Sequence, residues 1–151
     1  MAVLKLSPNQ PGIAKLLAES DAYMAGLYPA ESNHLTDIRA LSDPSTTLVG
    51  IVEKDEVVAC GALVRQKNGY AELKRMFVPK DLRGRGYGKK ILHELMSIAD
   101  TENLTLRLET GTKQPEAISL YQSHGFVGIE AFEPYGPDPL SVFMERAKYA
   151  R

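Results

Sequence analysis

The sequence predicts an α/β protein built on a mixed, mostly antiparallel sheet. Apolar and β-branched runs of strand length alternate with segments whose apolar residues recur three or four positions apart, as on one face of a helix. Asn68-Gly69 lies between two strand-like runs and is a strong hairpin signal, so the central strands are expected to pair antiparallel. The chain has 151 residues, of which 44% are hydrophobic, and we expect a single domain spanning residues 1–151 with a substantial buried core.

In the first half, a short strand at 2–6 is followed by a turn at Ser7-Pro8-Asn9 and by helical spacing of Ile13, Leu16 and Leu17. Asp43-Pro44-Ser45 interrupts the chain before three strand-like runs. The elements expected here are a helix to about residue 26, a loop at 28–33, a short helix at 34–41, and strands at 47–53, 57–66 and 70–78.

In the second half, Pro79 ends the third of these strands because proline cannot donate a ladder hydrogen bond. Helical spacing then runs to about Asp100. Pro115 suits the first position of a helix, and Gly125 suits the residue after its end. The elements expected here are strands at 104–109, 126–132 and 141–146, a helix at 115–123, and a proline-rich loop at 133–140.

Composition excludes several classes of protein. The formal net charge is −1, so the chain as a whole does not resemble a nucleic-acid or anionic-membrane binder. One cysteine, Cys60, cannot form an intrachain disulfide, and its apolar neighbours indicate a core position. No secretory segment or long apolar run is present, and the expected location is cytoplasmic. No metal is expected, since the histidines lack metal-site spacing.

A turn rich in glycine and cations lies between the third strand and the helix that follows it. Glycine accepts unusual backbone angles and lets a ligand approach the main chain closely. The first N–H groups of a helix have no internal partner, and together with the helix dipole they attract phosphate. Arginine and lysine side chains add full charge. The turn is therefore predicted to bind a pyrophosphate through residues Arg83, Gly84, Arg85, Gly86, Tyr87, Gly88 and Lys89.

Two other phosphate-binding patterns fit this turn less well. The P-loop pattern fails because Gly84 stands only four residues before Gly88, and Lys90 occupies the position of the magnesium-binding hydroxyl. The dinucleotide pattern G-x-G-x-x-G fails because the third glycine comes one residue early. A turn that only caps a helix remains an alternative when the glycines are considered alone.

Two motifs together carry a family resemblance. Arg83-x-x-Gly86-x-Gly88, after a strand ending at Val78-Pro79, resembles the acetyl-CoA signature of the GNAT superfamily of N-acetyltransferases. The segment 114–126 is similar to a later motif of that superfamily, N-x-x-A-x-x-x-Y-x-x-x-G-F, with Gln114 in place of asparagine. The resemblance is to bacterial members of the small-molecule type, and it implies a sheet with helices on both faces.

The resemblance also implies an acetyl donor and its contacts. Acetyl-CoA would place its pyrophosphate on the glycine turn, and its pantetheine arm would pair with the backbone of Met76, Phe77 and Val78. Gln114 would contact the same arm through a longer amide than the usual asparagine.

Three residues are candidates for catalysis. Tyr121 occupies the position where the superfamily often has a tyrosine that protonates the departing thiolate, and a phenol with a pKa near ~10 suits that task. An amine acceptor is mostly protonated at neutral pH, so a base is needed. Glu72 is the first candidate and Glu109 the alternate. Each could instead be a solvated charge or the partner of Lys74 or Arg107.

The acceptor is expected at a mouth framed by residues 28–34 and 133–140. Tyr28, Glu31, Asn33 and His34 are the candidate contacts in the first of these stretches. Their acidic and aromatic character suits a cationic amine, whereas Arg39 nearby would suit a carboxylate, as in an amino acid.

The predicted function is transfer of an acetyl group from coenzyme A to a primary amine of a small molecule or peptide, by direct attack in a ternary complex. The alternative is a non-catalytic regulator that binds acyl-CoA. An RNA-binding role is disfavoured because no aromatic platform accompanies the cations. No nucleic-acid or membrane partner is expected, and a homodimer is suggested only by the resemblance.

Overall fold

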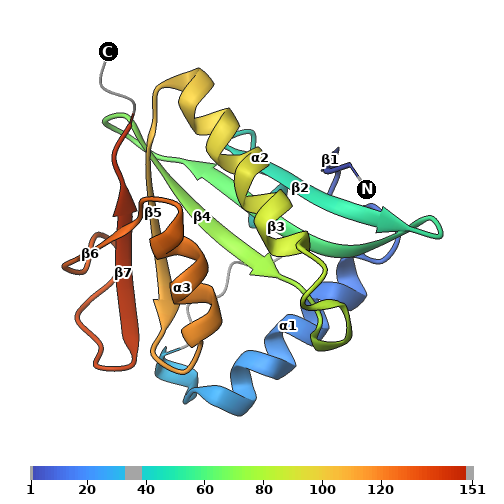
Figure 1. Ribbon diagram of the computed structural model, residues 1–151, viewed down its shortest axis with the longest axis horizontal. Coiled ribbons are helices and arrows are strands. Elements are labelled where there is room, and N and C mark those ends of the chain that lie inside the picture. The colour runs from blue at the N-terminus through green and yellow to red at the C-terminus, as the bar shows by residue number, and fades with distance from the viewer. Residues whose placement is uncertain (1, 33–38, 149–151) are drawn as a thin grey trace.

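The centre of the molecule is a sheet in the strand order β1-β2-β3-β4-β5-β7-β6 (Figure 1). The structure, a computed structural model, describes residues 2–32 and 39–148. The β4–β5 pair is parallel, and the other pairs among the described strands are antiparallel, as predicted. The strands are β1 (Leu4–Leu6), β2 (Thr46–Glu53), β3 (Glu56–Arg65), β4 (Tyr70–Phe77), β5 (Thr105–Gly111), β6 (Val127–Ile129) and β7 (Ser141–Arg146).

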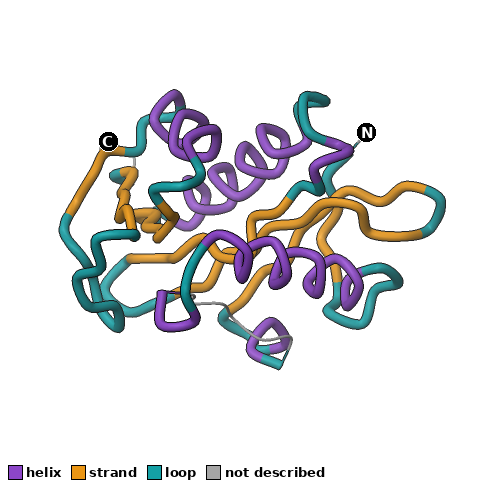
Figure 2. The backbone as a smooth tube through the Cα atoms, turned by 90° about the horizontal axis from the view of Figure 1, so that it is seen from below, coloured by secondary structure: helices purple, strands orange, loops and turns teal. Residues whose placement is uncertain are grey.

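Helices cover both faces of this sheet, which confirms the expected fold class. The helix α1 (Ile13–Leu27) lies on one face, and α2 (Tyr87–Glu102) and α3 (Pro115–Ser123) lie on the other (Figure 2). Short 3-10 turns occur at η1 (Ala30–Ser32), η2 (Ala40–Ser42) and η3 (Lys80–Leu82). The helix expected at 34–41 falls mostly outside the described residues, and η2 occupies its end. No helix in the described part of the chain combines the length and apolar character needed to cross a membrane.

Each face of the sheet has its own apolar core. The α2 stripe of Ile91, Leu92, Leu95 and Ala99 is completely buried against the central strands. Burying an isoleucine or leucine side chain contributes about 1.5–3 kcal/mol, so this stripe fixes α2 firmly on the sheet. On the opposite face, α1 packs Ile13, Leu16 and Leu17 against another set of strand residues that includes Cys60. The predicted core position of Cys60 is confirmed.

The strands β4 and β5 separate halfway along their length. Their pairing runs from Tyr70 opposite Thr105 to Leu73 opposite Leu108 and then stops. The register between β3 and β4 shifts at the same level, and Arg75 has φ of 55°, in the left-handed region. An irregularity of this kind bends a strand. Figure 1 shows β4 and β5 diverging beyond it, so the β4 edge after Leu73 faces a gap rather than a partner strand.

Candidate functional site

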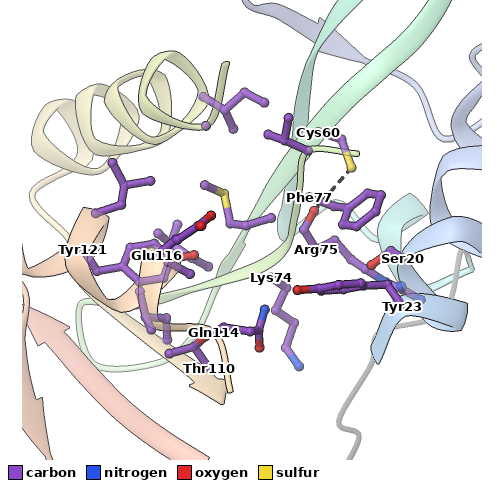
Figure 3. A pocket seen from close by; sticks show the side chains of 18 of the residues that line it. Ser20, Tyr23, Cys60, Lys74, Arg75, Phe77, Thr110, Gln114, Glu116 and Tyr121 are labelled. Carbon is purple, nitrogen blue, oxygen red and sulfur yellow. Dashed lines mark hydrogen bonds between the residues drawn. The ribbon is translucent and has the colours of Figure 1, made fainter. Parts of the chain in front are cut away.

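A cavity of about 600 Å³ occupies the place where β4 and β5 separate. Its walls come from α1, β4, the glycine turn, the start of α2, the end of β5, α3 and the β6–β7 loop (residues 130–140). Figure 3 shows labelled side chains from α1, β4, β5 and the α3 segment around one space, with Tyr121 and Gln114 on one side and Tyr23, Ser20 and Arg75 on the other. One cavity therefore connects the predicted coenzyme turn with the candidate catalytic residues.

The glycine turn has the backbone that a phosphate site requires. Gly84 and Gly86 have φ of 83° and 80°, and a Cβ added at either would meet no heavy atom within 4 Å. Glycine is therefore required here by the left-handed backbone and not by lack of space. Gly86 is the N-cap of α2 and provides no side-chain cap, so the first amides of α2 keep their capacity to bind an anion.

The cations of the turn are not equivalent. Arg83 lines the cavity, its Nε donates to the Val78 carbonyl at 3.0 Å, and its guanidinium lies 4.9 Å from the Tyr23 ring centre. Lys89 also lines the cavity. Arg85 is not among the lining residues, and its side chain lies instead by the Tyr87 hydroxyl. That hydroxyl donates to Glu53 of β2, so the Tyr87 side chain anchors the start of α2 to the sheet.

The remaining predicted coenzyme contacts line the same cavity. Met76, Phe77 and Val78 form its wall along β4 and the residue that follows it. Gln114 precedes α3, and its Oε1 accepts a hydrogen bond of 3.3 Å from the Tyr28 hydroxyl. The amide is therefore already engaged with a residue from the end of α1, a contact that an asparagine would be too short to make in the same way.

Tyr121 is buried where α3 faces the cavity. Its side chain is 6% exposed, its ring packs 5.6 Å from that of Phe126, and none of the described residues hydrogen bonds its hydroxyl. Burial raises the pKa of Tyr121 well above its ordinary value. A buried hydroxyl without a protein partner at a cavity wall is available to a bound ligand.

Glu72 is buried at the cavity wall in a network of side chains. It is 1% exposed, and it accepts hydrogen bonds from the Gln66 amide at 3.0 Å and from the Tyr135 hydroxyl. The Lys74 ammonium lies 3.6 Å from the carboxylate and donates to the Tyr135 hydroxyl at 2.8 Å. Burial, and then the hydrogen bond to Glu72, raise the pKa of Tyr135. The interpretation of Glu72 as a partner of Lys74 thus holds, alongside its position at the cavity.

Glu109 lines the cavity from the end of β5. One of its oxygens accepts a 2.8 Å hydrogen bond from the Ser141 hydroxyl. Arg107, considered as its partner, forms its ion pair with Glu145 instead. Burial raises the pKa of Tyr28, and the charge of Glu109 raises it further. The same charge contributes to the raised pKa of Tyr135, so Glu109 lies between residues of both stretches predicted to frame the acceptor.

Those two stretches meet in the structure. The Ser32 hydroxyl donates to Asp138 at 2.7 Å, across 106 residues of sequence. Tyr28 is buried beneath them, because Gly111 has no side chain and leaves room for its ring. Glu31 is exposed on η1 and does not line the cavity, and Asn33 and His34 lie outside the described residues.

Several cavity residues were not singled out by sequence reasoning. Ser20, Tyr23 and Lys113 line the space, and Lys74 entered only as an ion-pair partner. Their role depends on contacts between distant segments, which carry no local motif.

The histidines form a surface contact. His93 and His124 approach with Nε2 atoms 2.9 Å apart, and His124 is the C-cap residue of α3. No group of three or more potential metal ligands occurs within residues 2–32 and 39–148.

Comparison with known proteins agrees with this geometry. The model of the acetyltransferase (GNAT) family matches residues 13–126. The chain belongs to this family. It is 41% identical over 148 residues, 97% of each chain, to an IAA acetyltransferase of Azospirillum brasilense. Relatives of this kind are N-acetyltransferases, and the present GNAT protein is an N-acetyltransferase as well.

Solved GNAT structures share its fold. A proposed acyl-CoA N-acyltransferase of Klebsiella pneumoniae is 33% identical and superposes with a TM-score of 0.80, covering 98% of this chain and 97% of that one. A proposed streptothricin acetyltransferase of Bacillus anthracis, solved in complex with acetyl coenzyme A, is 21% identical with a TM-score of 0.62. It covers 76% of this chain and 69% of that one, and at this identity the likeness extends to the fold alone.

Proposed function

We propose that this GNAT protein transfers an acetyl group from acetyl-CoA to a primary amine of a small molecule or peptide, by direct attack in a ternary complex. The observation that carries the proposal is the continuity of one cavity. It joins the glycine turn, the unpaired edge of β4, Tyr121 and two carboxylates. An acetyl donor and an amine can therefore meet without moving between sites, and holding two reactants together removes part of the entropic barrier of a bimolecular transfer.

The turn and β4 would hold the donor. Arg83, Lys89 and the first amides of α2 suit the phosphates of coenzyme A, because they combine charge with oriented N–H groups. The main chain after Leu73 lacks a partner on the β5 side and suits the amides of the pantetheine arm, as in the addition of a strand to a sheet edge. Coenzyme A would supply an acetyl group activated as a thioester.

Tyr121 would serve as the proton donor to the departing sulfur. Burial keeps its hydroxyl protonated at neutral pH, and that hydroxyl faces the cavity without a protein partner among the described residues. A protonated phenol at the cavity wall can donate a hydrogen bond to the sulfur as negative charge develops on it, and can pass its proton as the C–S bond breaks.

Glu109 and Glu72 are the candidate bases, and their surroundings favour Glu109. Glu72 accepts two hydrogen bonds and lies beside the Lys74 ammonium. These contacts stabilise the ionised carboxylate, so they oppose its taking a proton from the amine. Glu109 is half-buried at the same cavity, whereas Glu72 is 1% exposed, so Glu109 is better placed to pass a proton to water.

The proposal is tested first by coenzyme binding and turnover. Thermal unfolding is measured with acetyl-CoA beside NADH and ATP. A ligand at a hundred times its Kd stabilises the folded state by about 2.7 kcal/mol, which is readily visible. We expect a shift with acetyl-CoA alone, followed by release of free thiol when amines are added. A larger shift with NADH or ATP would overturn the coenzyme assignment, and binding without thiol release from any amine would indicate a regulator.

The choice of base is tested with Glu109→Gln and Glu72→Gln, using Glu130→Gln in an exposed position as the control. Loss of a general base lowers turnover by about 10²–10⁴-fold. We expect that loss for Glu109→Gln, with a smaller one for Glu72→Gln. The reverse order would assign the role to Glu72.

A further inference from the structure

One group of residues lining the cavity, outside the glycine turn, carries charges of both signs. We call it the acceptor chamber and define it by Glu72, Lys74, Glu109, Lys113, Ser32 and Tyr135, all of which line the cavity. The cations of the coenzyme turn are separate from this set. A chamber that served only a polycationic amine would be expected to carry carboxylates without cations, since like charges repel at short range. The two lysines therefore call for an explanation.

Lys74 is held in the chamber by contacts that do not use all three of its N–H donors. Its side chain is only 21% exposed, its ammonium donates to the Tyr135 hydroxyl at 2.8 Å, and the Glu72 carboxylate is 3.6 Å away. Figure 3 shows the Lys74 side chain extending into the cavity from β4. An ammonium has three donors, and these contacts leave at least one that can bind an anion.

Lys113 is the second cation, and it has no acidic partner among the described residues. Its ammonium donates to the Leu27 carbonyl at 2.9 Å and lies 5.9 Å from the Tyr28 ring centre. Its backbone N–H donates to the Tyr28 hydroxyl at 3.0 Å, which fixes the segment after β5 against the end of α1. Arg75, the other cation nearby, differs because its guanidinium forms an ion pair of 2.5 Å with Asp21.

Two observations add polar groups suited to a small ligand with both charges. The Ser20 hydroxyl lines the cavity from α1, is buried, and has no hydrogen-bond partner among residues 2–32 and 39–148. Glu109 provides negative charge on the β5 side of the chamber, near the Tyr28 and Tyr135 hydroxyls. A buried hydroxyl without a partner at a cavity wall usually meets a ligand or an ordered water.

We infer that the acceptor is a small amine that also carries a carboxylate, as an amino acid does, with the carboxylate bound by Lys113 and Lys74 and the amine facing Glu109. This inference rests on the proposed function and specifies its acceptor. Lysine ammonium groups bind carboxylates through charge-assisted hydrogen bonds, and a neutral or cationic amine would leave them without that partner.

Acetylation of such an acceptor converts an ammonium and a thioester into an amide, a thiol and a free proton. The ammonium first gives one proton to solvent through Glu109, and the neutral nitrogen attacks the thioester carbonyl carbon. The C–N bond forms, the C–S bond breaks, the leaving sulfur takes the Tyr121 proton, and the nitrogen gives its second proton to Glu109. That proton returns to Tyr121 through solvent, so the products are the N-acetyl amino acid, the coenzyme thiol and one proton. The acceptor carboxylate is unchanged and serves only in binding.

The test compares acceptors that differ only in the carboxylate. Phenylalanine is measured beside phenethylamine and phenylalanine methyl ester, and lysine beside cadaverine, with thiol release giving kcat/KM for each. We expect kcat/KM for each free amino acid to be at least about tenfold higher than for its analogues without a carboxylate. A tenfold difference corresponds to only about 1.4 kcal/mol of binding free energy. Kanamycin is added as a polycationic acceptor and is expected to be poor.

Variants then assign the preference to the lysines. Lys113→Met, on an exposed residue that is not needed for the core, is expected to raise the acceptor KM about tenfold and to reduce the preference for the free amino acid by a similar factor. Lys74→Met is expected to do the same, and Lys67→Met, outside the cavity, is the matched control. The KM for acetyl-CoA should remain unchanged in all three, because the coenzyme turn is not altered.

Other outcomes separate the inference from the function on which it rests. Efficient acetylation of phenethylamine, cadaverine or kanamycin, with Lys113→Met unchanged, would overturn the carboxylate subsite while leaving the acetyltransferase intact. A lysine effect on acetyl-CoA KM would reassign the lysines to the coenzyme. Absence of thiol release with every amine would reject the proposed function, and the inference with it.

Discussion

The coenzyme turn and the acceptor chamber share one cavity but are built in opposite ways. The turn and its strand lie in the short segment from Met76 to Lys89, and the main chain supplies much of their binding capacity. The chamber is assembled from η1, β4, β5 and the β6–β7 loop, through side-chain hydrogen bonds such as Ser32–Asp138 and Tyr135–Glu72. A local main-chain site suits a ligand that does not vary, whereas a site made of distant side chains can change its specificity one residue at a time.

Tyr121 stands between the two regions, and its replacement should have the largest effect. Tyr121→Phe removes the proton donor but keeps the ring that packs on Phe126. Loss of general acid catalysis lowers turnover by about 10²–10⁴-fold. We expect kcat to fall by about a hundredfold, with the acetyl-CoA Kd from calorimetry nearly unchanged. A loss of coenzyme affinity instead would make Tyr121 part of the coenzyme site only.

Gly86→Ala should affect the coenzyme turn and leave the chamber unchanged. A non-glycine residue in the left-handed region costs about 1–2 kcal/mol, although the added methyl meets no neighbour. The free turn will relax, and binding must restore it, so we expect the acetyl-CoA Kd to rise roughly tenfold. The acceptor KM should stay the same.

Gly128→Ala is the control for this change. Gly128 also has open space around it but does not have a positive φ. Equal effects of the two substitutions on coenzyme affinity would mean that the conformation of the turn is not what binds phosphate.

Ser32→Ala should affect the chamber and leave the turn unchanged. It removes the 2.7 Å hydrogen bond to Asp138 that ties η1 to the β6–β7 loop. A hydrogen bond to a charged group contributes about 1.5–3 kcal/mol, and less where water can replace it. We expect the acceptor KM to rise several-fold and the acetyl-CoA KM to stay constant, as measured by steady-state kinetics.

Ser45→Ala provides a matched comparison for Ser32→Ala. Ser45 also donates to an aspartate at 2.7 Å, but the partner is Asp43, two residues away on the exposed surface. This local bond joins no distant segments, so its loss should change neither KM. Similar kinetics for the two variants would show that the long-range bond does not shape the chamber.

The smallest expected effect is on the pH profile of kcat, which depends on the protonation of Tyr121 and of the acceptor amine. Burial raises the pKa of Tyr121, and a proton donor remains functional at every pH below its pKa. We expect kcat to rise with pH as the acceptor loses its proton, with no decline below about pH 10, the ordinary tyrosine pKa. A descending limb near pH 8 that disappears in Tyr121→Phe would contradict this assignment.

The coenzyme turn could be predicted from the sequence more fully than the acceptor chamber. The hairpin at Asn68-Gly69, the glycine turn and the helix after it depend on neighbouring residues, and their positions agree with the structure. The divergence of β4 from β5 could not be predicted, because it depends on a register shift against β3 and on the left-handed backbone of Arg75. No local pattern indicates that arginine adopts such a conformation.

The chamber was only partly predictable for a related reason. The two loops that frame it were anticipated from their irregular sequences, and Glu72 and Glu109 from their strands. The link from Tyr135 to Glu72 spans 63 residues, and the placement of Lys113 depends on Tyr28, 85 residues away. The Tyr87 side chain lines the cavity, and its hydroxyl is also bonded to Glu53 of β2, 34 residues away. Such contacts follow from the tertiary fold and not from residue spacing.

Because Cys60 is buried, the reactivity of its thiol reports whether the protein is folded. This residue is the only cysteine of the chain, its side chain is 0% exposed, and burial raises the pKa of its thiol to about 12. The thiolate is the form that attacks disulfide reagents, so the folded protein should stay silent in a colorimetric thiol assay near neutral pH. Every thiol detected during turnover then comes from the coenzyme. Unfolding exposes one reactive thiol per chain. The thiol concentration of a denatured sample therefore gives the concentration of protein chains.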